Sequence, residues 1–548
     1  MVLAQGVTSV PEVAWSSFAP ELTVTTAALV LLLIAIAKGR QQLVAVPTAV
    51  LAVAGGAWLV TQEQVVPGGV AIVLGIALPA LVVAFPRRGS LVQAWGAGLA
   101  LLGGLVLTAW QYVAVLDVGG ADAATILPQS GLDGALANDG IAFFTRLTVY
   151  LAALLVIPIG YGYLQDRRIN RAEVEPLVLL AAVGMAALGT ANDLITVFVA
   201  VEILSLALYV LAGLARRDRR SQEASLKYFV LGAVASAILL YGMALTYLAA
   251  GTLGLPQIDG ALGLVTSDRT VAVLGLALIT VGVGFKVALV PFQLWTPDVY
   301  QGAPTNVTAF MAAATKAAGF AAILRLYLVA FPSLQSLWVP VLAVLAALTM
   351  LYGAYLAVVQ RDLKRMLAYS SITHAGYATI GVVAVSDAGL SGTLWYLLTY
   401  AVSTLAAFAC IIAVERTRRG EVTLFEVRGL GRTSPALAGI LALALLSLAG
   451  LPPTAGFVGK LVVFQAGVEA GLTWLVVIGV VSSVVAAFFY LRIAGVMFLE
   501  EPDEDRPLPA SSGGLTAGIA VAATLVVLLG IQPQLFLQVA DAAAALLR

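Results

Sequence analysis

The sequence predicts an all-α polytopic protein that crosses a lipid bilayer many times. Of its 548 residues, 61% are hydrophobic and only 11% are charged, and the mean hydropathy is +1.01. Soluble domains carry about 25% charged residues, so a soluble fold of this length could not bury so much apolar surface. Short segments of alternating hydrophobicity, which would indicate a membrane β-barrel, are absent from the sequence.

Apolar segments long enough to span a membrane follow one another along the chain. A spanning helix needs about 20 mostly apolar residues. By this criterion we expect sixteen helices, at 20–37, 42–60, 69–85, 92–115, 139–164, 175–191, 193–213, 227–250, 270–294, 306–331, 338–359, 366–385, 391–414, 436–466, 473–499 and 514–537. The loops between these helices are short, so the sequence predicts no soluble domain.

The loops on the two sides of the membrane differ in charge. Because loops rich in Lys and Arg stay in the cytoplasm, this asymmetry predicts an even number of helices with both termini outside. The basic loops contain Lys38, Arg40, Arg87, Arg88, Arg167, Arg168, Arg171, Arg216, Arg217, Arg219, Arg220, Arg361, Lys364, Arg365, Arg416, Arg418, Arg419, Arg428 and Arg432. The opposite loops contain Glu63, Asp117, Asp122, Asp133, Asp259, Asp387 and Glu469, with Arg269 as the only cation.

Cysteine and histidine usage excludes several kinds of site. The single cysteine, Cys410, cannot form an internal disulfide, a zinc site or an iron–sulfur cluster. His374 is the only histidine, so a metal site built on a histidine pair is excluded as well. The run FVGKL lacks the glycine spacing of a phosphate-binding loop, and no dinucleotide-binding GxGxxG motif follows a strand.

A few ionisable residues lie within the apolar segments, where each costs roughly 2.5–3.5 kcal/mol near a helix centre. They are Asp193, Glu202, Lys227, Lys286, Lys316, Arg325, His374, Lys460 and Arg492. Lys227, Arg325 and Arg492 lie near enough to helix ends for their heads to reach the membrane surface. The deeper residues, among them Glu202 and Lys286, are predicted to be functional.

Glu202 and Lys227 lie on consecutive predicted helices, so their charges can compensate each other. Burial lowers the pKa of a lysine, whereas a neighbouring carboxylate raises it. A lysine under both influences can take up and release a proton near neutral pH. The pattern therefore favours a proton relay that needs no cofactor.

Two of the apolar segments are interrupted, and each interruption has a lysine beside it. GVGFKVALVPFQLW contains Lys286 and Pro291, and LAGLPPTAGFVGK contains a Pro-Pro pair before Lys460. Proline removes a backbone donor and clashes with the preceding turn. Broken helices at membrane depth persist only where protein or water satisfies the freed backbone groups. Paired breaks of this kind are typical of transporters built from inverted repeats.

Long runs of the sequence resemble the antiporter-like membrane subunit N of respiratory complex I, the proton-pumping NADH:quinone oxidoreductase. These runs are EPLVLLAAVGMAALGTANDLITVFVAVEILSLALYVLAGL, KYFVLGAVASAILLYGMAL, FKVALVPFQLWTPDVYQGAPTNVTAFMAAATKAAGF, RDLKRMLAYSSITHAGY and LAGLPPTAGFVGKLVVF. The resemblance covers roughly residues 139–500. Lys460 fits subunit N, because the M-type paralogue usually carries a glutamate there.

The resemblance implies a fold of fourteen helices with two inverted five-helix repeats, in which the seventh and twelfth helices are broken. Since sixteen segments are apolar, we expect an added helix pair near the N-terminus. The implied regions are N-terminal transmembrane helices at 1–138, a first repeat region at 139–331 with its broken helix at 270–294, a second repeat region at 332–500 with its broken helix at 436–466, and a cytoplasmic loop and C-terminal helix at 501–548.

The family's proton-path residues match this chain one by one. They are Glu202, Lys227, Lys286, Lys316, His374 and Lys460. The family commonly has a histidine where this chain has Gln293, which we expect to hold water rather than carry a proton.

The resemblance also implies what surrounds the chain. We expect a multi-pass protein of the bacterial plasma membrane, whose partners are the neighbouring antiporter-like and small membrane subunits of complex I and the lipid bilayer, with no nucleic acid. NADH, FMN, iron–sulfur clusters and quinone belong to partner subunits, and this chain binds none of them. The alternatives are a subunit of a multisubunit sodium/proton antiporter or of a membrane-bound hydrogenase. A purely structural scaffold is a third reading, which the buried charges disfavour.

Overall fold

The structure is a computed structural model that describes residues 15–37, 41–61, 64–85, 89–117, 130–131, 134–169, 171–264, 269–417, 422–502 and 508–545. The expected all-α membrane architecture is confirmed within these residues. Thirteen of the described helices are long and apolar enough to cross a membrane. The one sheet among the described residues pairs β1 (Ser130–Gly131) with β2 (Leu136–Ala137) in antiparallel register.

Each of the sixteen predicted apolar segments contains helix. The N-terminal helices are α1 (Ala19–Ile36), α2 (Gln42–Thr61), α3 (Val65–Ala84) and α4 (Gly89–Asp117). The middle helices are α6 (Gly140–Asp166), α7 (Val174–Thr190), α8 (Leu194–Ala212), α9 (Arg219–Ala250), α10 (Leu255–Leu264), α11 (Arg269–Val287), α12 (Trp295–Gly302), α13 (Thr305–Phe310) and α14 (Lys316–Arg325). The C-terminal helices are α15 (Gln335–Val358), α16 (Leu363–Val383), α17 (Asp387–Thr417), α18 (Leu430–Thr433), α19 (Pro435–Ala449), α20 (Ala455–Glu469), α21 (Thr473–Leu499), α22 (Gly513–Ile531) and α23 (Gln534–Ala545).

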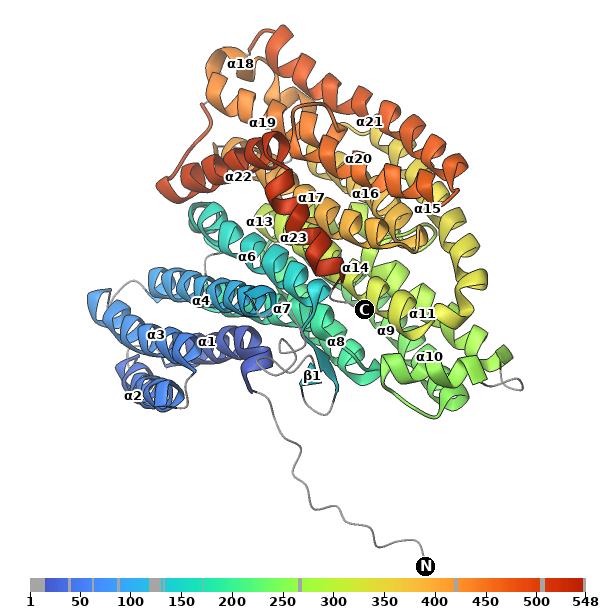
Figure 1. Ribbon diagram of the computed structural model, residues 1–548. Helices are drawn as coiled ribbons and strands as arrows, with labels where there is room; N and C mark the ends of the chain where they lie inside the picture. The colour runs from blue at the N-terminus through green and yellow to red at the C-terminus, as the bar shows by residue number, and fades with distance from the viewer. Residues whose placement is uncertain are drawn as a thin grey trace, which may run out of the picture.

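The two helices at the centre of the molecule are buried along their whole apolar windows. One is the continuous span Thr305–Ala330, in which π-helical stretches at Met311–Thr315 and Leu326–Ala330 flank α14, and the other is α17. Figure 1 shows α1–α4 on one side of this centre and α15, α16 and α19–α21 on the other. The helix α23 packs across α6 and α17.

The first predicted break separates α11 from α12. Between them, residues 288–294 leave the helix, and Ala288 takes a left-handed φ of 62°. The freed backbone groups bond to protein, since Val290 N donates to Thr349 Oγ1 at 2.9 Å and the indole of Trp295 donates to Phe285 O at 2.9 Å. A break at membrane depth is stable for this reason.

The second predicted break separates α19 from α20. The helix α19 ends at Gly450, whose φ of 83° favours glycine. The backbone N–H of Gly456 in the first turn of α20 donates to Ser447 Oγ at 3.0 Å, which ties the two halves together. Lys460 lies on α20 and reaches back across the break to Ala449 O at 2.8 Å.

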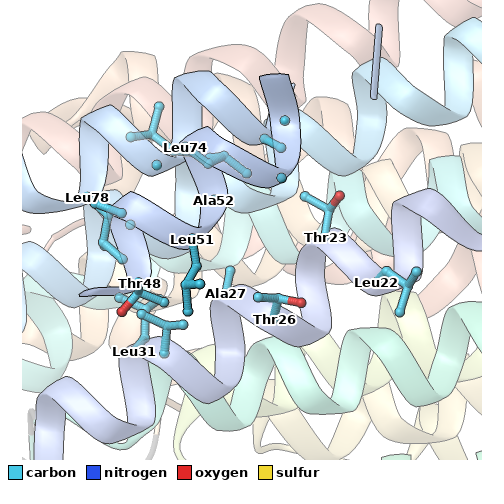
Figure 2. A pocket seen from close by; sticks show the side chains of 18 of the residues that line it. Leu22, Thr23, Thr26, Ala27, Leu31, Thr48, Leu51, Ala52, Leu74 and Leu78 are labelled. Atoms are coloured by element: carbon cyan, nitrogen blue, oxygen red, sulfur yellow. The ribbon is translucent and has the colours of Figure 1, made fainter. Parts of the chain in front are cut away.

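The N-terminal pair α2 and α3 packs closely on itself. A Cβ at Gly56 would lie 2.7 Å from Gly68 O, so only glycine allows this approach. An apolar pocket of about 480 Å³ lies between this pair and α1 and α4 (Figure 2). Figure 2 shows leucine, alanine and threonine side chains around it, and no lining residue is charged. The pocket therefore contains none of the buried charges that the sequence singles out.

Candidate functional site

Lys286 occupies the last turn of α11, where the helix breaks. Its side chain is 6% exposed, and its Nζ donates to Ser205 Oγ on α8 at 2.5 Å. The Glu202 carboxylate, one turn before Ser205, attracts the Lys286 ammonium through space. The rings of Tyr209 and Tyr228 each lie with their centroid 5.8 Å from Nζ. The Lys286 cation is thus held by a hydroxyl and by aromatic faces, while the Glu202 carboxylate forms no direct ion pair with it.

One carboxylate oxygen of Glu202 has no hydrogen-bond partner among the described residues. This atom, Oε1, is buried. Buried carboxylate oxygens are normally hydrogen-bonded. This oxygen of Glu202 can therefore accept a hydrogen bond from a water molecule or take up a proton.

Lys227 does not lie where its pairing with Glu202 was expected. Its ion partners are Asp298 on α12 and Glu223 one turn earlier on α9, each with an N–O distance of 2.7 Å. The same Asp298 also accepts from Arg365 at 2.7 Å. The Lys227 side chain is 41% exposed, so the predicted compensation between Glu202 and Lys227 is wrong in this structure. An aspartate from a distant helix is nearer than the carboxylate of the preceding one.

Lys316 joins the first break to α16. It begins α14 directly after a π-helical stretch, a distortion that is frequent at functional sites. Its Nζ donates to Val287 O at 3.1 Å and to Ser371 O at 2.6 Å. The Val287 carbonyl is one of the last in α11, which no intrahelical donor can reach. Because Val287 follows Lys286, Lys316 contacts the backbone directly after Lys286.

His374 stands three residues after Ser371 on α16, and both of its ring nitrogens meet a tyrosine hydroxyl. Nδ1 lies 2.5 Å from Tyr396 Oη on α17, and Nε2 lies 3.2 Å from Tyr490 Oη on α21. Tyr490 also shares a short hydrogen bond with Ser370. A hydroxyl both donates and accepts, so each of these contacts can pass a proton.

Lys460 is 5% exposed and completes the series in the second break. Its Nζ donates to Ala449 O and to Ser483 Oγ, both at 2.8 Å. It also lies 4.8 Å from the centroid of the Tyr377 ring. Tyr377 is three residues after His374, and the two rings meet edge to face with centroids 5.5 Å apart. Tyr377 thus stands between His374 and Lys460.

The structure therefore places five of the predicted residues in order across the molecule, four of them buried and Glu202 half-buried. In order they are Glu202, Lys286, Lys316, His374 and Lys460. Lys227 is not part of the series by any of these contacts.

Sequence reasoning missed the hydroxyl groups between the charged members. They are Ser205, Tyr377, Tyr396, Ser483 and Tyr490. One signal was available in SSITHAGY, where Ser371, His374 and Tyr377 recur every three residues and so share one helix face.

Gln293 lies in the non-helical stretch of the first break and is 4% exposed. Its Oε1 is buried without a hydrogen-bond partner among the described residues. No hydrogen bond of the described residues joins its side chain to Lys286 or Lys316. Its expected role with water stays a prediction.

Other intramembrane charges stabilise the fold. Arg325 is 1% exposed and donates to both carboxylate oxygens of Asp139, at 2.5 and 2.7 Å, and to Gly189 O. Its partners lie at the start of α6 and in the last turn of α7, so its head is near these helix ends but buried within the protein. Asp193 caps α8 by accepting from Thr196 N at 2.8 Å. Arg492 is half-buried and donates to carbonyls at the end of α15 and just beyond it.

A second buried pair was not anticipated from the sequence. Arg146 on α6 is 1% exposed and donates to Glu21 on α1 through Nε at 2.6 Å and Nη2 at 3.0 Å. Gln111 and Asn138 accept from its other terminal nitrogen. The pair locks α1 onto α6, far from the series of lysines along the chain.

Comparison with known proteins places this geometry in a family context. A family model described as "NADH:quinone oxidoreductase/Mrp antiporter, TM" matches residues 191–486. NADH-quinone oxidoreductase subunit N of Rhodococcus opacus is 54% identical over 69% of this chain and 71% of its own length. The protein of the same name from Mycobacterium tuberculosis is 50% identical over 69% of this chain and 72% of its own length.

Solved structures agree with these sequence matches. A chain of respiratory complex I from Thermus thermophilus with bound aureothin is 38% identical, with a TM-score of 0.68 over 85% of this chain and 98% of its own. A chain of the Mrp complex from Dietzia sp. is 24% identical, with a TM-score of 0.70 over 92% of this chain and 97% of its own. The second likeness shows the fold alone.

Proposed function

The chain belongs to the NADH:quinone oxidoreductase/Mrp antiporter family of membrane subunits, as a subunit N, and we propose that it moves protons along the buried series from Glu202 to Lys460. It is a proton-translocating membrane subunit of the oxidoreductase. The observation that carries the proposal is the order of these groups across the molecule. Lys316 bonds to Val287 O in the first break and to Ser371 O on α16, and Tyr377 lies between His374 and Lys460 at the second break.

The chemistry of the contacts divides the series into two kinds of step. From His374 onward, hydroxyl groups of Tyr396, Tyr490 and Ser483 can each accept one proton and release another. Lys316 meets the rest of the series through the carbonyls of Val287 and Ser371, which accept hydrogen bonds but hold no proton to release. Transfer from Lys286 to Lys316 and from Lys316 to His374 therefore requires water, and Gln293, with its unpartnered Oε1 in the first break, is our candidate to hold it in the first of these steps.

Energy for the transfer comes, in this proposal, from quinone reduction in partner subunits. NADH, FMN, iron–sulfur clusters and quinone bind there, and this chain acts as a non-redox translocating subunit. Its partners are the neighbouring antiporter-like and small membrane subunits in the bacterial plasma membrane. The arginine-rich loops lie on the cytoplasmic side and both termini on the outer side. Residues 139–331 and 332–500 form the two repeat regions, each with one break.

The test is the substitution Lys286→Ala, studied in the assembled oxidoreductase reconstituted into vesicles. We expect the complex to assemble, because Ser205 keeps its hydrogen bond to Val201 O within its own helix, and to lose most of its proton flux per NADH oxidised. The matched control is Arg269→Ala, which removes an exposed cation at the other end of the same helix α11. If assembled Lys286→Ala complex pumps like the wild type, the series is structural and the relay runs elsewhere.

A further inference from the structure

A wide cleft opens at the arginine-rich end of the helix bundle. Its volume is about 930 Å³, within the range of roughly 300–1,000 Å³ typical of ligand sites. Loops after α6, α8 and α12 form its walls, together with the start of α16 and the end of α17. The cleft contains none of the residues of the buried proton series.

The lining of this cleft is strongly cationic. Eight cationic side chains face three acidic ones, a formal excess of five positive charges. The cationic residues are Arg167, Arg168, Arg171, Arg216, Arg217, Arg219, Arg220 and Lys364. Such a concentration of like charge creates a positive potential that draws anions toward the cleft.

The acidic residues of the cleft already have other roles. Glu415 is 5% exposed and accepts from Arg167 at 2.8 Å and from the Thr305 hydroxyl. Asp218 caps α9 and Asp362 caps α16, by accepting from Arg220 N at 3.0 Å and Arg365 N at 2.7 Å. The positive ends of two long helices therefore also point toward the cleft, which adds to its preference for anions.

Three arginines elsewhere on this face do form ion pairs. Arg428 pairs with Glu500 at 2.5 Å, Arg432 with Glu501 at 3.3 Å and Arg416 with Asp166 at 2.7 Å. In the cleft, by contrast, Arg216 and Arg217 form no ion pair with any described residue. The orientation rule for membrane proteins explains why arginines gather on this face. It does not explain why Arg216 and Arg217 lack carboxylate partners.

We infer that the cleft binds a phosphate-bearing anion, held by the guanidinium groups of Arg216 and Arg217 and their neighbours. The planar fork of arginine matches phosphate oxygens and forms charge-assisted hydrogen bonds with them. Two sources supply this chemistry at such a position: the headgroup of an anionic phospholipid, and a soluble polyphosphate. Arg168 and Arg171 follow directly after the membrane helix α6, which places the cleft at headgroup level and favours the phospholipid.

The inference can be tested on the purified oxidoreductase containing the double variant Arg216→Gln/Arg217→Gln. The matched control is Arg428→Gln/Arg432→Gln, which removes the same charge from exposed, ion-paired arginines on the same face. The wild-type complex and both variants are delipidated. They are then titrated separately with phosphatidylglycerol in mixed micelles, with phosphatidylcholine in mixed micelles, and with inorganic pyrophosphate. Bound ligand is measured by native mass spectrometry, and thermal unfolding is followed in parallel.

We expect phosphatidylglycerol, but not phosphatidylcholine, to bind and to raise the unfolding midpoint. Exposed ion pairs contribute about 0.2–1 kcal/mol each, so losing two arginines should weaken binding roughly 2- to 30-fold. The control should bind like the wild type. If pyrophosphate binds, and binds more weakly to the Arg216→Gln/Arg217→Gln variant, the cleft is still an anion site but its ligand is a soluble polyphosphate. The inference is overturned if neither anion binds, or if both double variants bind as the wild type does.

Discussion

Gly450→Ala should move Lys460 away from its partners and thereby slow proton transfer through the second break. Gly450 has a φ of 83°, and an alanine in this left-handed region costs about 1–2 kcal/mol. A Cβ at Gly450 would lie 2.7 Å from Cδ and 3.2 Å from Nζ of Lys460. Carbon atoms pack at about 3.5–4.0 Å, so the lysine stem must move by roughly 1 Å.

That displacement affects both hydrogen bonds of the ammonium. Nζ now donates to Ala449 O and Ser483 Oγ at 2.8 Å, and a shift of this size takes at least one of them beyond hydrogen-bond range. A misplacement of about 1 Å at a reacting group can cost on the order of 100-fold in rate, which we take as the upper limit for the effect. The assay is the number of protons moved per NADH oxidised in inverted vesicles, at matched complex content.

Two further variants separate the causes. Gly439→Ala changes a glycine of the same helix α19 whose Cβ would meet nothing within 4 Å, so pumping should be unchanged. Gly450→Asn tolerates the left-handed conformation but still introduces the Cβ, so it should lose flux if the contact with Lys460 is the cause. Full proton stoichiometry in assembled Gly450→Ala complex would refute the reasoning. It would mean that protons do not pass Lys460 in this geometry.

Substitutions at Lys460, Gln293 and Asp139 test separate links. Lys460→Glu should alter the pH dependence of proton flux, because a carboxyl group becomes charged by losing a proton whereas an amine becomes charged by gaining one. An unchanged pH profile and flux would mean that Lys460 takes no part in proton transfer. Gln293→His should be tolerated and Gln293→Leu should slow pumping, because leucine cannot order water; wild-type flux in Gln293→Leu would place the step from Lys286 to Lys316 elsewhere. Asp139→Asn should destabilise the subunit by about 3–5 kcal/mol by leaving buried Arg325 unpaired. The thermal unfolding midpoint measures this loss of stability. The control Asp166→Asn, which removes a more exposed partner of Arg416, should cost only about 0–1 kcal/mol. Equal losses in the two variants would argue against the Asp139 prediction.

The sequence by itself determined the properties that act over one helix length. Hydrophobicity within about 20 residues decides whether a segment enters the bilayer, and each of the sixteen predicted segments contains helix. Proline acts on the turn in which it lies, so the amino-acid sequence alone locates the breaks beside Lys286 and Lys460. The cost of a buried charge is also local, and Lys286, Lys316 and Lys460 are indeed buried.

Only the tertiary structure decided which groups meet. Lys227 pairs with Asp298 across 71 positions, and Arg325 with Asp139 across 186, because packing of distant helices brings these groups together. Glu202, on the helix that precedes Lys227, attracts Lys286 and not Lys227. For the same reason, the sequence did not predict the contacts of the Tyr396, Tyr490 and Ser483 hydroxyls. A tyrosine or serine fits an apolar helix wherever it lies, and its partner depends on a helix face that no local pattern specifies.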